Sequence, residues 1–452
     1  MFDASSSKEK VFHLLIWAAE IYLAWCVYCC FYNLYLHPLR GFPGPKLAAA
    51  SRLYEFWYDV VKDGQYLWKI ERLHEEYGPI IRVNPSELHV RDSQFYSQIY
   101  ASGSRVINKV TTGGGGFAAP RSVASTVDHH LHRARRGYLG PFLSKRAIVK
   151  MEDFINERID CLCRRFESCI KDQVPIALDP AFAAFTVDII TWFLYGEHSD
   201  YVGNPDRKVE ATEAADGLTG LYNLSKFFSL LMPTLNLLPN WAVRLISPPA
   251  AGLLALKRDT KQRILSSMME GESKIEPTSF VLSALTDPEI PPAERHIDRL
   301  MDEGTVVILA GSETTARALS VGMFYLLDNE SHFTRLRDEL TALPTELDQH
   351  YSLAQLEKLP YLSGVVRETL RLSFGPIDLF PRVAVTESLQ YGDFTIPPGT
   401  PVSQSTYFVH TDPAIFPDPF TFDPDRWARG GPSLNKFLVN FSKGSRQCVG
   451  IE

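Results

Sequence analysis

The residue best suited to chemistry is Cys448, which lies near the end of the 452-residue chain. Residues 441–450 read FSKGSRQCVG, so that Cys448 stands between two glycines and two residues after Arg446. Glycine permits close backbone approach, and a neighbouring cation stabilises a thiolate. A single cysteine without a CxxC partner cannot build a tetrahedral zinc site, whereas one thiolate can be the axial ligand of a haem iron. The alternative is a glycine-flanked cysteine of the core.

Two other segments carry acidic residues at helical spacing. Glu368 and Arg371 are three residues apart and share one helix face, where the alternative is an ordinary surface ion pair. Residues 310–315 read AGSETT, in the middle of a long helical pattern. The hydroxyl of Thr314 is expected to bond an internal carbonyl and open a local bulge beside a ligand. The alternative for this segment is a capping-type cluster on an exposed face.

Basic residues gather in a third region, around residues 132–146. His132 and Arg136 are four residues apart on one helix face, and Arg382 follows far along the chain. Arginine stays charged and can bind a carboxylate through two hydrogen bonds. Four further cations are expected to form either a local basic patch or a merely solvated face: Arg133, Arg135, Lys145 and Lys443.

These segments together resemble the cytochromes P450. Residues 441–450 match every fixed position of that family's haem-binding loop, Phe-x-x-Gly-x-Arg-x-Cys-x-Gly. Residues 368–371 match its Glu-x-x-Arg motif, residues 422–427 (FDPDRW) its arginine-containing segment, and residues 310–315 its oxygen-binding groove. The resemblance implies haem b with Cys448 as iron ligand, and it implies further roles for three groups of residues. Haem contacts are Phe441, Arg446, His132, Arg136 and Arg382; proton carriers are Glu313 and Thr314; a buried structural cluster is Glu368, Arg371 and Arg426.

The resemblance also implies an activity. Residues 37–49 and 77–85 look like those of fungal microsomal P450s of secondary metabolism, trichodiene-oxygenase-like in general appearance. We therefore expect a haem-thiolate monooxygenase that hydroxylates or epoxidises an apolar terpenoid or polyketide. It would use O2 and electrons from NADPH–cytochrome P450 reductase. One alternative is an enzyme of this fold that rearranges peroxides without a reductase. The other is a truncated, inactive P450-like membrane protein, because the chain ends at Glu452 where the family continues into a helix and strands.

The N-terminus is expected to be a membrane anchor. Residues 14–32 form an apolar run with Glu20 as the single charge, close to the ~20 residues that a membrane-spanning helix needs. The alternative is a buried hydrophobic helix. We predict an anchor over residues 1–36, a Pro/Gly hinge over 37–46 and a catalytic domain over 47–452. The protein would then be a single-pass protein of the endoplasmic reticulum membrane with a cytosolic body.

The remaining patterns predict a mainly α protein with small β-sheets, an α+β fold that the resemblance identifies as the cytochrome P450 fold. No alternation of strands and helices suggests a doubly wound sheet. The predicted elements are strands at Ile80–Val83, Glu87–Val90 and Thr395–Ser403, and helices at Arg146–Lys171, Pro180–Tyr195, Ala293–Leu327 and Leu353–Leu372.

Charge and motif content limit the class of partner that the protein can bind. The net charge of −7 and the absence of a nucleic-acid motif exclude nucleic acid as an expected partner.

Substrate contacts are expected from residues 101–127, 216–245, Val306–Ala310 and Ile377–Phe380, with apolar pocket walls at Phe117, Leu309 and Phe380. The glycines at 113–116 predict a mobile access loop.

Overall fold

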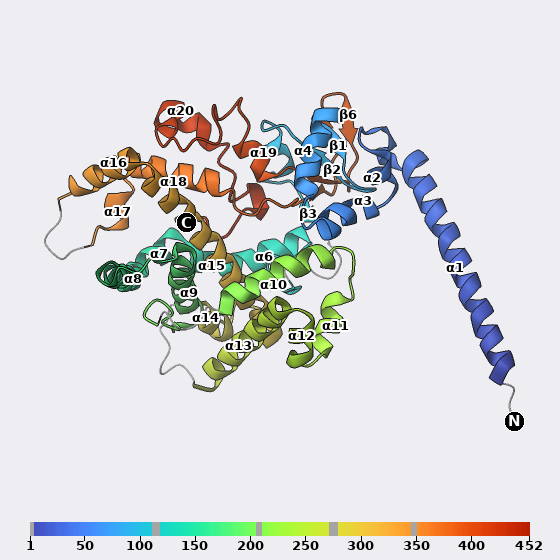
Figure 1. Ribbon diagram of the computed structural model, residues 1–452, viewed down its shortest axis with the longest axis horizontal. Coiled ribbons are helices and arrows are strands. Elements are labelled where there is room, and N and C mark those ends of the chain that lie inside the picture. Colours follow the sequence, from blue (N-terminus) through green and yellow to red (C-terminus); the bar gives the residue numbers. More distant parts are fainter. Residues whose placement is uncertain (1–3, 111–117, 205–209, 271–278, 345–349) are drawn as a thin grey trace. The chain divides into compact units, whose positions relative to one another are not determined.

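The computed structural model spans residues 1–452 and describes all of them except 1–3, 111–117, 205–209, 271–278 and 345–349 (Figure 1). Helices predominate and strands are short, as predicted. The chain forms two compact units, one of residues 1–99 with 379–404 and one of residues 100–378 with 405–452. The predicted access loop at 113–116 and the predicted pocket residue Phe117 lie outside the described residues.

The first unit begins with the long helix α1 (Ala4–Tyr35). Its segment Phe12–Tyr35 has a mean hydropathy of 1.8 and is 0% buried, so it is long and apolar enough to cross a membrane. A second helix of this kind, α9 (Leu178–Tyr195), is 67% buried and belongs to the core of the second unit. The apolar run at the N-terminus is therefore an exposed helix and not the buried one of the alternative.

The predicted hinge is bound closely to the sheet of the first unit. It contains a 3-10 turn (Pro38–Gly41), after which the carbonyl of Pro43 accepts the N–H of Arg82 at 2.7 Å. A Cβ atom on Gly44 would lie 2.7 Å from the carbonyl oxygen of Arg82, so only glycine allows this approach. The buried Arg82 guanidinium also donates to the carbonyl of Asn33 at 2.9 Å. Residues 33–44 are thus anchored to a strand.

Four strands of the first unit form a sheet in the order β1-β2-β7-β4, and two more form a hairpin. The pairs β1–β2 and β4–β7 are antiparallel, and β2–β7 is parallel. The predicted strand Thr395–Ser403 is divided by a turn at Pro397 to Gly399, where Gly399 has φ +80°. The strands are β1 (Ile80–Arg82), β2 (Leu88–Val90), β4 (Arg382–Ala384), β5 (Leu389–Tyr391), β6 (Phe394–Ile396) and β7 (Pro401–Ser403). The helices of this unit after α1 are α2 (Lys46–Ala50), α3 (Leu53–Phe56), α4 (Tyr66–Tyr77) and α5 (Tyr96–Ile99).

The second unit is helical and is centred on α15 (Ile297–Asp328), which packs against α9 and α13. Its main core cluster combines apolar side chains of these helices with those of their neighbours. The other elements are β3 (Ile107–Lys109), α6 (His129–Leu139), α7 (Lys145–Lys150), α8 (Glu152–Asp172), α10 (Glu210–Ser225), α11 (Leu231–Leu237), α12 (Asn240–Ile246), α13 (Pro248–Glu270), α14 (Phe280–Thr286), α16 (Glu330–Thr341), α17 (Leu353–Leu356), α18 (Pro360–Ser373), α19 (Thr406–His410) and α20 (Arg426–Asn435).

Three predicted helices differ in detail from those observed. The helix predicted over 146–171 is broken at Met151 between α7 and α8. The helix predicted over 353–372 is broken before Pro360, because proline lacks an N–H and suits the first position of a new helix. The long helix was predicted to begin at Ala293 but begins at Ile297. The side chain of His296 caps this end of the helix by accepting the N–H of Asp298.

Candidate active site

Cys448 lies in a tight loop that turns its thiol outward. The N–H of Cys448 donates to the carbonyl of Phe441 at 2.9 Å, and a 3-10 turn (Gly444–Arg446) fills the interval between them. The side chain of Cys448 is exposed and forms no disulfide. The loop therefore presents one sulfur atom at its surface, and the alternative of a buried core cysteine is wrong.

A glycine makes the position of this loop possible. Gly444 has φ +76°, and a Cβ atom there would lie 2.1 Å from the carbonyl oxygen of Ala101. The next residue, Ser445, donates its N–H to the same carbonyl at 3.1 Å. Any side chain at position 444 would therefore separate the loop from residue 101.

Two arginines hold the part of the loop next to Cys448. Arg446 is buried and donates to the carbonyls of Thr126 at 2.8 Å and Val127 at 2.7 Å, and also to that of Ile107. Arg136, on α6, donates to the carbonyls of Gln447 and Cys448. Burial lowers the pKa of Arg136, and the neighbouring Cys448 acts in the opposite direction. His132, one turn earlier on α6, is buried.

The central helix exposes a short polar face in its otherwise buried middle. Ala310 and Thr314 are exposed, although Leu309, Ser312 and Ala316 are buried. The hydroxyl of Thr314 donates to the carbonyl of Ala310 at 2.7 Å, as the sequence predicted. The expected bulge is absent, because α15 runs through this point as a continuous α-helix.

The face of α15 and the Cys448 loop lie in the same part of the second unit. Val449 packs against the core cluster that contains Leu309 and Ala316, and Figure 1 shows the C-terminus beside α15. Leu309, predicted as a pocket wall, is 5% exposed and belongs to this core.

Glu313 lies on another side of α15 from Thr314, since successive residues of an α-helix are about 100° apart. Its side chain is half-buried, and its Oε1 atom has no hydrogen-bond partner within the described residues. Burial raises the pKa of Glu313, while a hydrogen bond with Thr212 lowers it. The carboxyl group can therefore hold a proton at a higher pH than an exposed glutamate.

Glu368 is the centre of a fully buried ion cluster. Its Oε1 atom accepts from Arg371 at 2.6 Å and from Arg426 at 2.9 Å, and its Oε2 atom accepts from the indole of Trp427 at 3.0 Å. Glu368 and Arg371 are both 0% exposed, which excludes the surface ion pair. The structure thus brings together the three residues of the predicted structural cluster.

His410 joins this cluster to the segment before the Cys448 loop, and the sequence carried no signal for it. Its Nδ1 atom is 3.0 Å from the carbonyl oxygen of Arg371, and its Nε2 atom accepts the N–H of Val439 at 2.9 Å. The ring is fully buried, and this burial lowers the pKa of His410 from 6.5 to about 3. His410 therefore stays neutral and acts as a fixed bridge.

Three other predicted residues have partners of their own within the chain. Arg382 lies on β4 in the first unit, where it donates to the carbonyls of Phe380 and Pro381. Arg135 does not belong to a basic patch, because its guanidinium is mostly buried and is bound to Glu294 at 3.0 Å. Lys145 is exposed but paired with Glu357 at 2.6 Å.

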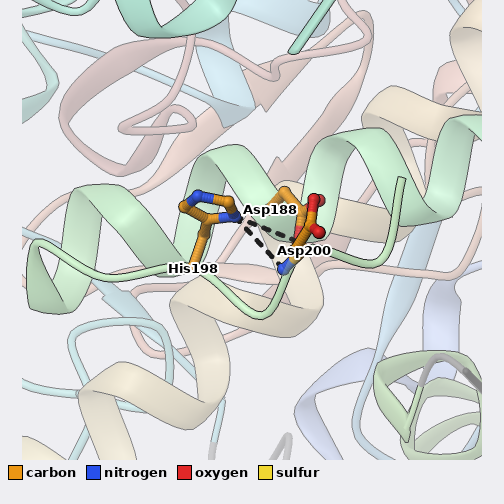
Figure 2. A group of neighbouring side chains, drawn as sticks. All are labelled: Asp188, His198 and Asp200. Carbon is orange, nitrogen blue, oxygen red and sulfur yellow. Dashed lines mark hydrogen bonds and ion pairs between the residues drawn. The ribbon is translucent and has the colours of Figure 1, made fainter. Parts of the chain in front are cut away.

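A possible cation cluster is already neutralised by the chain itself. Asp188, His198 and Asp200 offer ligand atoms within 4.8 Å of one another (Figure 2). The guanidinium of Arg158 lies 2.7 Å from Asp200 and 4.0 Å from Asp188. Asp188 also accepts backbone N–H groups of the loop that follows α9. This cluster is a structural clamp on that loop.

Comparisons with known proteins identify the family of the chain. Residues 47–452 match the family Cytochrome P450. The cytochrome P450 monooxygenase TRI4 of Trichoderma arundinaceum is 49% identical over 100% of this chain and 88% of its own length. The cytochrome P450 monooxygenase SAT11 of Stachybotrys chartarum is 48% identical over 96% and 83%. The conidiogenone synthase PchP450 of Penicillium rubens is 41% identical over 93% and 84%.

Cytochromes P450 bind haem through a cysteine thiolate. Two features of the second unit are suited to binding haem. The exposed thiol of Cys448 is available as a ligand, and its loop depends on a glycine that no other residue can replace. Ala310 and Thr314 are exposed one turn apart on α15, directly after the buried stretch 302–309. The chain belongs to the cytochrome P450 family and is a haem-dependent monooxygenase.

Proposed function

We propose that this monooxygenase inserts one oxygen atom from O2 into an apolar terpenoid or polyketide of fungal secondary metabolism, with Cys448 as the iron ligand. The observation that carries the proposal is the exposed thiol on a loop held by Arg136 and Arg446. The relatives named above support the substrate class, since one is a conidiogenone synthase and others are P450 monooxygenases of fungi. The haem supplies the activation of O2 when bound.

The residues around Cys448 have two tasks in this proposal. Arg136 holds the loop by the carbonyls of Gln447 and Cys448, and Arg446, within the loop, ties it to the carbonyls of Thr126 and Val127. His132, Arg136 and Arg382 are proposed to bind the haem propionates, and Phe441 and Arg446 complete the haem-binding loop. The buried cluster of Glu368, Arg371 and Arg426 is proposed to keep the segment behind this loop rigid.

Proton delivery is assigned to α15. The hydroxyl of Thr314 lies on the exposed face and donates its proton to the carbonyl of Ala310; it can donate toward a ligand when the hydroxyl turns away from that carbonyl. Glu313 can store a proton because burial raises its pKa. The two side chains point in different directions, so ordered water is needed to connect them.

Electrons are proposed to come from NADPH–cytochrome P450 reductase. The helix α1 is proposed to anchor residues 1–36 in the endoplasmic reticulum membrane, with 37–46 as the connection and 47–452 as the cytosolic catalytic domain. Arg133 and Lys443 remain candidates for a docking surface for the acidic reductase.

The test is the carbon-monoxide difference spectrum of the reduced protein after haem supplementation. We expect the Soret band typical of thiolate ligation in the wild type and in Cys163→Ser, which removes another exposed thiol. Cys448→Ser should lose this band. Its absence from soluble wild-type protein would refute Cys448 as the iron ligand of the proposed reaction. The alternative of peroxide rearrangement requires turnover without NADPH.

A further inference from the structure

An irregular segment connects the central helix to the Cys448 loop. Residues 118–127, called the bridging segment here, precede α6 and lie in the second unit. Ala119, Ser122 and Thr126 in this segment are buried, although it contains no helix or strand. A buried irregular segment must find partners for its backbone polar groups outside regular secondary structure. Some of these partners lie in turns of the segment itself, and charged side chains supply others.

Two consecutive carboxylates of α15 hold the middle of the bridging segment. Asp302 accepts the N–H of Arg121 at 3.0 Å, and Glu303 accepts the N–H of Val123 at 2.9 Å. The carboxylates are 1% and 2% exposed. Hydrogen bonds to a charged acceptor are about twice as strong as neutral ones, so these two contacts are strong constraints on the backbone.

Each carboxylate has its own buried counter-charge. Glu303 is paired with Arg299, one turn earlier on α15. Asp302 is 3.2 Å from the ammonium group of Lys257 on α13, and Lys257 also donates to the carbonyl of Ala118 at 2.8 Å. The charges that hold the bridging segment are therefore compensated, and the desolvation of both carboxylates is offset.

The far end of the bridging segment holds the Cys448 loop. The carbonyls of Thr126 and Val127 accept hydrogen bonds from Arg446, two residues before Cys448. The hydroxyl of Thr126 accepts from Arg135 at 2.9 Å. Arg135 is bound to Glu294 at 3.0 Å, and Glu294 is bound to Arg299 at 2.9 Å. A continuous network of charges thus runs from Glu303 to the segment that holds Arg446.

We propose that Glu303 and Asp302 are positioning residues for the iron-ligating loop. They fix the bridging segment on α15, and this segment fixes Arg446 and through it the sulfur of Cys448. The inference rests on the proposed role of Cys448 as ligand. It adds that the stability of the iron–sulfur bond depends on two carboxylates that touch neither the thiol nor its loop.

Asp188 supplies a matched control. It is also a fully buried carboxylate paired with an arginine, and it also accepts backbone N–H groups of a loop, at Tyr201 and Val202. The clamp of that loop is formed by α8 and α9 and not by α15, so it is similar in kind to the Glu303 contact and lies on different helices. Glu303→Ala is compared with Asp188→Ala, and the isosteric Glu303→Gln with Asp188→Asn.

The first measurement does not depend on haem. Trypsin cleaves after Arg121, within the bridging segment, only when this segment opens locally. We expect Glu303→Ala to cleave there about tenfold faster than the wild type, as the loss of one charge-assisted hydrogen bond predicts. Glu303→Gln keeps an oxygen acceptor, so its cleavage rate should lie between those of the wild type and Glu303→Ala. Asp188→Ala should leave this site at the wild-type rate.

The second measurement is the lifetime of the thiolate Soret band in the reduced carbon-monoxide complex. It should shorten about tenfold in Glu303→Ala, shorten less in Glu303→Gln, and remain unchanged in Asp188→Ala and Asp188→Asn. Equal lifetimes in the Glu303 and Asp188 variants would overturn the inference. If Glu303→Ala does not fold, Glu303→Gln and Thr126→Val decide in its place. A wild type without the band refutes the function proposed for Cys448, whereas trypsin cleavage still tests the clamp.

Discussion

The Glu368 cluster and the Cys448 loop both gather ionisable groups in the second unit, and they differ in how those groups are partnered. Both oxygens of Glu368 accept hydrogen bonds, from two arginines, from an indole and from the N–H of Asp423. The sulfur of Cys448 is exposed, and the arginines beside it end on backbone carbonyls.

This difference separates a structural site from a chemical one. The cluster is complete within the chain, because each charge meets its partner and water is excluded. The backbone of the Cys448 loop is held by hydrogen bonds, whereas the sulfur of Cys448 remains exposed. Perturbations of the cluster should therefore change stability, and perturbations of the exposed atoms should change chemistry. The following predictions test this contrast from the largest expected change in stability to the smallest.

Replacement of Glu368 should have the largest effect. Glu368→Ala leaves two buried guanidinium groups without their carboxylate, which should lower the free energy of unfolding by about 3–5 kcal/mol. Urea unfolding followed by circular dichroism measures this change. The control is Glu357→Ala, which removes an exposed ion pair with Lys145 and should cost less than about 1 kcal/mol. Similar losses in the two variants would contradict the structural role of the cluster.

A methyl group at Gly444 should be the next most costly change. Gly444→Ala places a Cβ atom 2.1 Å from the carbonyl oxygen of Ala101 at a residue with φ +76°. We expect a loss of about 3 kcal/mol in the free energy of unfolding. Gly137→Ala, on α6, meets nothing within 4 Å and should stabilise the helix by about 0.5–1 kcal/mol. A Gly444→Ala protein as stable as the wild type would show that the loop does not dock closely.

Acid should lower the free energy of unfolding through His410, which joins the Glu368 cluster to the segment before the Cys448 loop. Burial lowers the pKa of His410 to about 3, so the unfolded chain binds this proton first as the pH falls below 6.5. The contribution of neutral His410 is fully present above pH 6.5 and is lost toward pH 3, by about 2 kcal/mol at pH 5. In His410→Gln, the free energy of unfolding should depend less on pH between 6.5 and 5.

Unfolding experiments in urea at a series of pH values measure this dependence. His296→Gln removes an exposed imidazole and is the control. The assignment of the bridge fails if His410→Gln and the wild type show the same slope.

The exposed threonine should affect stability least. Thr314→Val removes one hydrogen bond at an exposed position and should change the free energy of unfolding by less than about 0.5 kcal/mol. It should nevertheless raise the hydrogen peroxide released per NADPH consumed in the enzyme reconstituted with reductase, because the proton donor is lost. Thr315→Val is the neighbouring control. An unchanged peroxide yield would exclude Thr314 from proton delivery.

Features that depend on residues close together in the chain could be predicted from the sequence. The ten residues around Cys448 specify a turn that only glycine permits, and the Thr314 hydroxyl reaches a carbonyl one turn away in its own helix. The helical period likewise placed Glu368 and Arg371 on one face. Helix boundaries were less accurate, because a proline or a capping side chain such as His296 decides them within a few residues.

Contacts between distant segments could not be predicted in this way. The sequence predicted Arg135 to lie either in a basic patch or on a solvated face, yet folding brings Glu294 to it from 159 residues away and buries most of both side chains. The same holds for His410, which joins Arg371 to Val439, and for Glu303, which binds a backbone group 180 residues earlier. The sequence alone identified the candidates for iron ligation and proton delivery, because residue type and local spacing are enough to recognise them. Tertiary structure decided which charges are neutralised and which atoms remain exposed, because burial and pairing depend on what the fold packs around each group.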